Sequence, residues 1–207
     1  RSADFSADGI TDLVSLNYQA ANGLTDFSIS VWAKTANTDY QAILSGANAS
    51  VSDELIMWLS GSEFKPFIKN ESATISTSNI ADNAWHHLVW TRSGTQNCMY
   101  VDSVSQGCAT INNTAALDIA ANGLVLGQEQ DSVGGDYAAD QDFEGYIDEL
   151  KIYSAVLTTA EISALYNESL STCGSCVSAT AAYRFDECSW TGAGGEIKDD
   201  QATAHGT

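Results

Sequence analysis

Residues Leu124 to Leu150 read LVLGQEQDSVGGDYAADQDFEGYIDEL, and this stretch holds the most specific information about the fold. It opens with the short apolar run LVL and ends with FEGYIDEL, in which large apolar residues recur at strand-like spacing. Both ends favour strands with a buried face, so the residues between them form a loop. The rest of the chain is then the scaffold that holds this loop.

The loop is rich in carboxylates and amides and contains no Lys or Arg. Its oxygen-bearing side chains are those of Glu129, Gln130, Asp131, Asp136, Asp140, Gln141, Asp142 and Glu144. Such groups repel one another unless water or a hard cation takes up the charge, and Ca2+ accepts 6–8 oxygen ligands at loose geometry. The loop therefore predicts a calcium site. The alternative is a solvated acidic loop that Gln128 and Gln130 tie together by hydrogen bonds.

Short strand-like stretches separated by turn residues occur on both sides of this loop. They cover residues 3–5, 13–16, 27–33, 42–44, 54–59, 64–68, 85–91, the hairpin 99–106, and residues 124–126 and 144–153. One helix is expected after them, because Thr158 and Glu161 form a capping box and Ile162, Leu165 and Tyr166 follow at helical spacing. This order predicts an all-β fold, an antiparallel β-sandwich with one short C-terminal helix. We expect one domain over residues 1–168, and a Cys-containing linker with a terminal strand over residues 169–207.

The hairpin carries the first two of five cysteines. Folding it about Asp102 and Ser103 brings Cys98 and Cys108 almost opposite each other, which suits a disulfide. A disulfide indicates an oxidising compartment, so we expect a secreted or cell-surface protein. The three remaining cysteines are Cys173, Cys176 and Cys188. Cys188 is expected to pair with one of the other two, with a zinc site at 173–176 as the competing interpretation.

The formal net charge is −19, from 8 Lys and Arg against 27 Asp and Glu. Nucleic acid is excluded as a partner on this ground, since such binding needs cations against phosphates. No apolar run approaches the roughly 18 residues of a membrane span, so no membrane insertion is expected. The chain begins with Arg1, and we therefore expect a processed protein or a fragment.

Segments 27–32, 85–90, 99–102 and 143–157 together resemble bacterial laminin-G-like domains of the concanavalin-A-like jelly-roll type. Within that group, the LGQEQDSVGG sequence of residues 126–135 is similar to the calcium loop of the pentraxins. The resemblance covers most of residues 1–167, and it implies a surface or secreted protein of bacterial origin. Residues 179–207 resemble the opening of another such repeat, which implies neighbouring repeats. The alternative is that residues 181–185 close this domain's own sandwich.

Carried over by position, the pentraxin pattern implies calcium ligation by the side chains of Glu129, Asp131 and Gln141 and by the backbone carbonyl of Gln130. Pentraxin loops hold two adjacent ions, but Ala138 stands where the family has a further glutamate. This departure puts the second ion in question.

Two further parts of the calcium pattern are altered in this chain. Asp136 or Asp140 is expected to replace the missing loop glutamate. The family also supplies an Asp-Asn pair before a strand that resembles residues 53–58, and here Asp53 is the expected replacement, with Asn48 as the alternative.

Aromatic residues beside a calcium ion suit sugars, whose apolar faces stack on rings while the ion takes hydroxyls. Tyr137 in the loop and Met57 near Asp53 are the expected ligand contacts, whereas the tryptophans of the strands are expected in the core. The function expected is calcium-dependent binding of a carbohydrate or another surface ligand, as in a lectin.

Two other functions are weighed against this one. The first is a structural or adhesive spacer in which Ca2+ only stiffens a loop. The second is a glycoside hydrolase, but residues 142–149 lack the spacing of acids that such enzymes use. We therefore expect no enzyme. His86 and His87 are adjacent on a strand and point to opposite faces, so they are not expected to chelate one ion.

Overall fold

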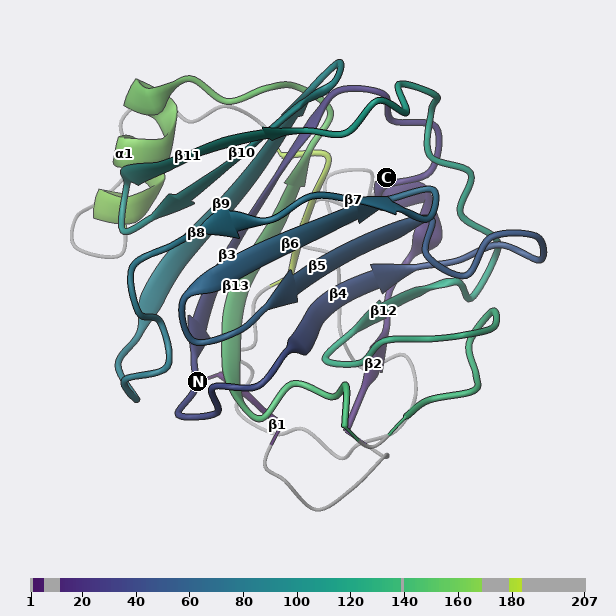
Figure 1. Cartoon of the computed structure of the whole chain (residues 1–207), viewed down its shortest axis with the longest axis horizontal. Helices are drawn as coiled ribbons and strands as arrows, with labels where there is room; N and C mark the ends of the chain where they lie inside the picture. Colours follow the sequence, from purple (N-terminus) through teal and green to yellow (C-terminus); the bar gives the residue numbers. More distant parts are fainter. Residues whose placement is uncertain (1, 6–11, 139, 169–178, 184–207) are drawn as a thin grey trace, which may run out of the picture.

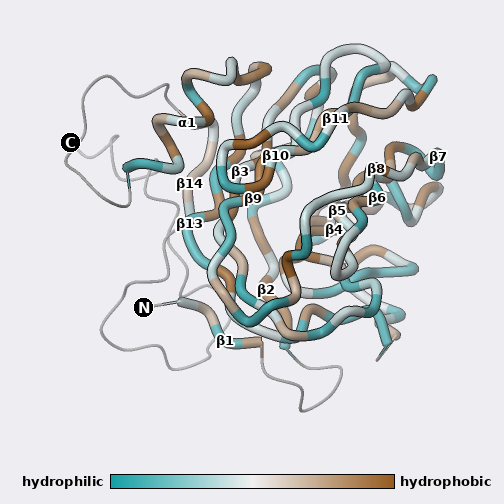
Figure 2. Tube along the Cα trace, turned by 60° about the vertical axis from the view of Figure 1, so that its left-hand side comes forward, coloured by the Kyte–Doolittle hydropathy of each residue, from teal (hydrophilic) through white to brown (hydrophobic). Residues whose placement is uncertain are grey.

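A computed structural model describes residues 2–5, 12–138, 140–168 and 179–183 of the 207. These residues form two seven-stranded antiparallel sheets packed face to face, and one α-helix outside them (Figure 1). Figure 2 shows the two sheets as separate layers, with the helix on the outer side of one of them. The predicted all-β sandwich with one short late helix is confirmed.

One sheet, called the helix sheet below, carries the helix on its outer face. Its strands in order are β1 (Ala3–Phe5), β13 (Gly145–Tyr153), β3 (Phe27–Lys34), β9 (His86–Ser93), β10 (Gln96–Val101) and β11 (Val104–Thr110), and β14 (Ala181–Tyr183) also pairs with β13. In β3, Phe27, Ile29 and Val31 belong to the interior core, so the residues between them face outward.

The other sheet, called the loop sheet, carries the acidic loop. Its strands in order are β2 (Val14–Ser15), β12 (Leu124–Leu126), β4 (Gln41–Gly46), β5 (Leu55–Leu59), β6 (Glu63–Ile68) and β7 (Glu71–Ser72), with β8 (Ile75–Ser76) also paired to β6. The two-residue strands β7 and β8 and a 3-10 turn over Tyr18–Ala20 are absent from the sequence predictions. They are too short for a period-2 pattern to show.

The helix α1 (Thr159–Glu168) begins at the predicted capping box. The Thr158 backbone N–H donates to the Glu161 carboxylate at 2.7 Å, and the Glu161 N–H donates back to the Thr158 hydroxyl at 3.3 Å. Ile162 and Leu165 are buried against Val89 on the outer face of the helix sheet. The helix therefore covers part of that face with a small core of its own.

The predicted disulfide joins Cys98 and Cys108, which are direct partners in the β10–β11 register with Cα atoms 4.0 Å apart. The hairpin turns at Asp102 and Ser103, whose φ angles of 49° and 65° fit a two-residue turn that follows the strand twist. Cys173, Cys176 and Cys188 lie outside the described residues.

Strand β14 pairs antiparallel with β13, from Ala181 opposite Ile152 to Tyr183 opposite Leu150. This part of the terminal segment therefore docks on the domain itself. The division at residue 168 and the second repeat stay predictions.

Two further findings concern single residues and membranes. Trp90 is fully buried as expected, but the prediction that Trp85 lies in the core is wrong, because its side chain is 38% exposed just before β9 begins. Among the described residues, no helix is both long and apolar enough to cross a membrane.

Candidate metal centre

The acidic loop leaves and rejoins the sandwich at Gly127, directly after β12. The Gly127 N–H donates to the Ile43 carbonyl at 2.8 Å, and its own carbonyl accepts from Phe143 at 2.9 Å. Its φ of 85° favours glycine, and a Cβ there would lie 2.1 Å from the Phe5 ring. Both ends of the loop are thus held at one point of the core.

Two glutamines tie the loop to the sheet, as the alternative interpretation of the sequence expected. The Gln130 amide donates to the Gly123 carbonyl at 2.9 Å and to the Ser45 hydroxyl at 3.1 Å, and its oxygen accepts from Gly134 at 2.8 Å. The Ser45 hydroxyl donates to the backbone carbonyl of Gln128 at 2.8 Å. Because the Gln130 side chain is used in this way, only its backbone is left for an ion.

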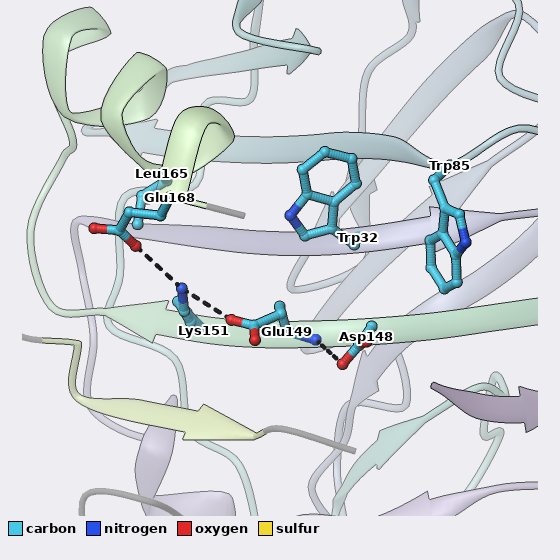
Figure 3. A pocket seen from close by; sticks show the side chains of 7 residues that line it. All are labelled: Trp32, Trp85, Asp148, Glu149, Lys151, Leu165 and Glu168. Carbon is cyan, nitrogen blue, oxygen red and sulfur yellow. Dashed lines mark hydrogen bonds and ion pairs between the residues drawn. The ribbon is translucent and has the colours of Figure 1, made fainter. Parts of the chain in front are cut away.

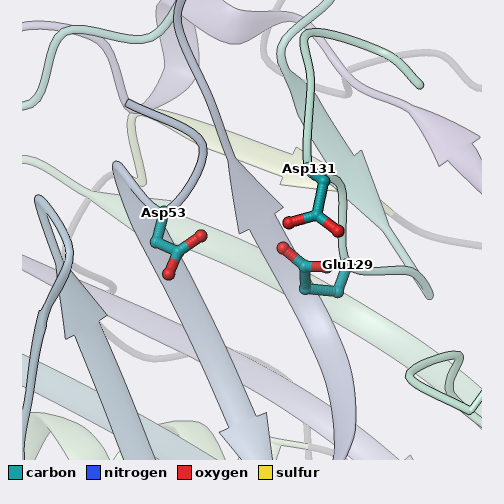
Figure 4. A group of neighbouring side chains, drawn as sticks. All are labelled: Asp53, Glu129 and Asp131. Atoms are coloured by element: carbon teal, nitrogen blue, oxygen red, sulfur yellow. The ribbon is translucent and has the colours of Figure 1, made fainter. Parts of the chain in front are cut away.

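Three carboxylates converge beside this loop. Asp53, just before β5, and Glu129 and Asp131, just after β12, offer oxygen atoms that all lie within 4.8 Å of one another (Figure 4). Glu129 is buried, Asp53 is half-buried and Asp131 is exposed, so the cluster opens to solvent at Asp131. The fold therefore brings together, from two distant segments, three of the five acids that the sequence predicts as ligands.

The charge of this cluster is not balanced by protein cations. In the described part of the chain, no ion pair involves any of the three carboxylates. Burial, followed by the charges of Asp131 and Asp53, raises the pKa of Glu129 to about 7. An unbalanced carboxylate cluster of this kind is costly without a cation or protons.

Two buried oxygen atoms on side chains of the acidic loop also lack protein partners. Glu129 Oε2 and Gln141 Oε1 are buried and have no hydrogen bond within the described residues. Buried polar atoms are normally paired, so orphaned oxygens of this type call for a ligand or water. A donor set of carboxylate and amide oxygens without sulfur or imidazole fits a hard divalent cation such as Ca2+.

The other predicted loop ligands are placed differently. Asp136 and Asp140 are exposed, and neither belongs to the group of three carboxylates. Ala138 stands close to Gln141, whose N–H donates to the Ala138 carbonyl at 3.3 Å. The cluster thus contains acids for one ion, and a second ion has no comparable group among the described residues.

The structure corrects the expected ligand surface beside Asp53. Met57 is fully buried and part of the interior core, so its side chain does not border a ligand as predicted. Residues alternate along β5, and Ile56 and Trp58 therefore face outward. Alternation in the sequence indicates which residues share a face, but the wrong face was assigned.

Trp58, which the sequence analysis places in the core with the other strand tryptophans, is not part of the interior core. It is half-buried, with its ring centroid 6.0 Å from that of Tyr40 and 5.6 Å from that of Phe67. Its register partner Ala42 donates its N–H to the backbone carbonyl of Gln141 at 3.0 Å. This bond places the aromatic group of Trp58, Tyr40 and Phe67 beside the loop. Tyr137 is half-buried in the loop, where burial raises the pKa of its phenol.

Comparisons with known proteins agree with this architecture. The human neuronal pentraxin receptor is 28% identical over 146 residues, covering 68% of this chain and 29% of the receptor. The chain spans well under half the length of the curated relatives it matches.

Solved structures share the fold at low identity. A heptameric SAP-like pentraxin from Limulus polyphemus superposes with a TM-score of 0.69 at 17% identity, over 80% of this chain and 79% of that one. A putative carbohydrate binding protein from Bacteroides ovatus reaches 0.71 at 16% identity, over 97% of this chain and 55% of that one. Because these matches include animal and bacterial proteins, they do not indicate the source of the chain.

The sequence pattern of the Pentaxin family matches residues 2–182, which include both sheets, the helix and the acidic loop. The chain therefore belongs to the pentaxin family.

Proposed function

We propose that this domain is a calcium-dependent, lectin-like binding module rather than an enzyme. One Ca2+ is held by the carboxylates of Asp53, Glu129 and Asp131, by the amide oxygen of Gln141 and by the backbone carbonyl of Gln130. The bound ion supplies open coordination positions for ligand hydroxyls. The protein residues neutralise the ion, fix its position and present aromatic rings beside it.

The observation that carries this proposal is the pair of buried, unpartnered oxygens on Glu129 and Gln141. Both atoms belong to residues of one loop on which the Gln130 side chain, by contrast, has hydrogen-bond partners for its amide nitrogen and for its oxygen. A solvated acidic loop accounts for exposed Asp131, but it gives no reason to bury Glu129 beside two further charges. A resident cation supplies that reason.

Carbohydrate is the ligand class that suits this arrangement best. Vicinal hydroxyls match the oxygen preference of Ca2+. The rings of Trp58 and Tyr137 offer faces on which the apolar side of a sugar stacks. The Cys98–Cys108 disulfide supports a secreted or cell-surface location, and neighbouring repeats of one polypeptide would make binding multivalent.

Calorimetric titration of EDTA-treated protein with Ca2+ tests the ion site. We expect saturable heat at about one ion per chain, with Mg2+ binding more weakly because it demands stricter octahedral geometry. Glu129→Gln should weaken Ca2+ binding by at least about tenfold, since it removes a charged ligand. Asp136→Asn is the matched control on the same loop and should bind as the unmodified protein does. Equal loss in both variants, or no heat with either ion, would contradict the proposal.

A glycan array probed with and without Ca2+ separates this function from its alternatives. Binding that requires Ca2+ supports the lectin-like module. A large calcium-induced rise in melting temperature without any glycan bound supports a structural or adhesive domain in which the ion stabilises the loop. Release of reducing sugar from β-glucans would instead indicate a glycoside hydrolase.

A further inference from the structure

A separate pocket lies on the other side of the sandwich, on the outer face of the helix sheet beside α1. Its volume is about 570 Å3, within the range of roughly 300–1,000 Å3 typical of small-molecule sites. Trp32 of β3, Trp85 before β9, Asp148, Glu149 and Lys151 of β13, and Glu168 of α1 line it (Figure 3). None of these residues contributes to the candidate calcium site.

A bulge in β13 sends two neighbouring acids into this pocket. Consecutive residues of a regular strand point to opposite faces, yet Asp148 and Glu149 both line the pocket. The register with β3 shifts between Asp148 and Lys151, and Glu149 has a φ of 51°, which is unfavourable for any residue except glycine. Bulges of this kind re-aim side chains and are common beside binding sites.

The two tryptophans differ in how they are held. Trp32 is stacked on Tyr166 of α1, with ring centroids 5.7 Å apart and planes 16° apart, so it forms a fixed wall. Trp85 is 38% exposed and lies 6.5 Å from the equally exposed Tyr146. Large aromatic rings at the mouth of a pocket offer surfaces for an apolar ligand face.

The charges in the pocket favour a neutral ligand. Lys151 Nζ lies 3.1 Å from the Glu149 carboxylate and 3.5 Å from that of Glu168, so part of the negative charge is compensated inside the pocket. An anionic ligand would meet three carboxylates and one ammonium group, which is unfavourable. A cation would compete with Lys151 for its own acids. Hydroxyl groups can donate to carboxylates and accept from an ammonium group at the same time.

We propose that this pocket is a second saccharide site that takes a neutral pyranose unit and works without Ca2+. The sugar stacks its apolar face on Trp85, while its hydroxyls contact the carboxylates of Asp148 and Glu149 and the ammonium group of Lys151. With the calcium site on the loop sheet, the domain then presents binding sites on both faces of the sandwich. The second site does not depend on the proposed calcium function.

Saturation-transfer NMR in EDTA tests this site, with the neutral disaccharides cellobiose, maltose and lactose as probes. We expect at least one of them to bind, and Trp85→Ala to weaken that binding by roughly tenfold through loss of the stacking surface. Asp148→Asn keeps the shape of the side chain and should weaken binding severalfold. This variant still tests the proposal if Trp85→Ala does not fold. Val104→Ala, at an exposed position on the same sheet, is the control and should bind normally.

Several outcomes would overturn the second site, each distinguishable from failure of the calcium site. These are no binding of any probe in EDTA, binding unchanged in Trp85→Ala, or binding only after Ca2+ is added. Preferential binding of tetramethylammonium would show that the pocket takes a cation instead of a sugar. Cleavage of a probe would show that the pocket hydrolyses its ligand.

Discussion

At the scale of a single residue, Glu129 is held in an unfavourable environment that a bound cation would relieve. Its carboxylate is buried, carries an oxygen without a protein partner, and faces Asp53 and Asp131. A bound cation would convert these repulsions into attractions, so the free energy of unfolding should rise with Ca2+ concentration through mass action.

His87 provides a pH-dependent prediction on the other sheet. Burial, and then the charge of Lys151, lower the pKa of its imidazole from 6.5 to about 4, although Asp102 acts in the opposite direction. The unfolded chain therefore binds the proton first as pH falls below 6.5, and the folded state loses stability down to about pH 4. We expect a loss on the order of 2–3 kcal/mol over this window, measured by urea denaturation. His87→Gln should flatten the profile.

The neighbouring His86 serves as an internal control for that experiment. Burial lowers the pKa of His86, but hydrogen bonds to Asp102 and Asp82 outweigh it and raise the pKa overall. Its contribution to stability is therefore present below pH 6.5 and lost as pH rises through the raised pKa. His86→Gln should change the profile in the opposite sense to His87→Gln. Parallel changes in the two variants would contradict both assignments.

At the scale of the element, the end of β12 decides where the acidic loop starts. Gly127 bonds to β4 through Ile43 and to the returning loop through Phe143. The Phe5 ring of β1 packs against this point and makes an edge-to-face contact with Phe143, at 6.2 Å between ring centroids. Residues from the first strand of the chain therefore help to position a loop more than a hundred residues later.

Replacing Gly127 by Ala tests this packing, with Gly23→Ala as a matched control. Both positions have positive φ, 85° and 82°, but a Cβ at Gly23 meets nothing within 4 Å. Each substitution should cost about 1 kcal/mol for the backbone. Gly127→Ala should cost roughly 1–3 kcal/mol more for the clash with Phe5. Equal denaturation midpoints for the two variants would show that the Phe5 ring moves away from the added Cβ without loss of stability.

At the scale of the whole molecule, the helix sheet is completed by segments from both ends of the described chain. β1 pairs with β13 at residues 145–147, and β14 pairs with it at residues 150–152. Tyr183 of β14 is 3% exposed and contributes to the interior core, so this late strand is part of the domain's packing.

Tyr183→Ala and a chain ending at residue 178 should therefore have similar effects. A strand of three residues that loses its one large buried side chain has too little apolar contact to remain docked. We expect both changes to lower the free energy of unfolding by about 2–4 kcal/mol, measured by chemical denaturation. If the truncation leaves the free energy of unfolding unchanged while Tyr183→Ala lowers it, the idea that both changes release β14 from β13 is contradicted. Val104→Ala, 62% exposed, is the control and should be neutral.

Local patterns in the sequence determine much of this protein. Alternating apolar residues identify the longer strands, the Thr158–Glu161 capping box identifies the start of α1, and two opposed cysteines identify the hairpin disulfide. The oxygen-rich loop without Lys or Arg indicates a calcium site before any coordinates are known. These features depend on neighbours along the chain or across one turn, and that is why a sequence reveals them.

Only the tertiary structure decides which distant residues meet and which face of a strand points inward. Asp53 joins Glu129, which lies 129 − 53 = 76 residues later in the chain, because β5 and β12 both pair with β4. Period-2 alternation leaves open whether Met57 or Trp58 is buried, and packing of the two sheets selects Met57. The bulge at Glu149 likewise depends on the register with β3. Long-range pairing and the close-packed interior set these outcomes, since neither is encoded by residues adjacent in sequence.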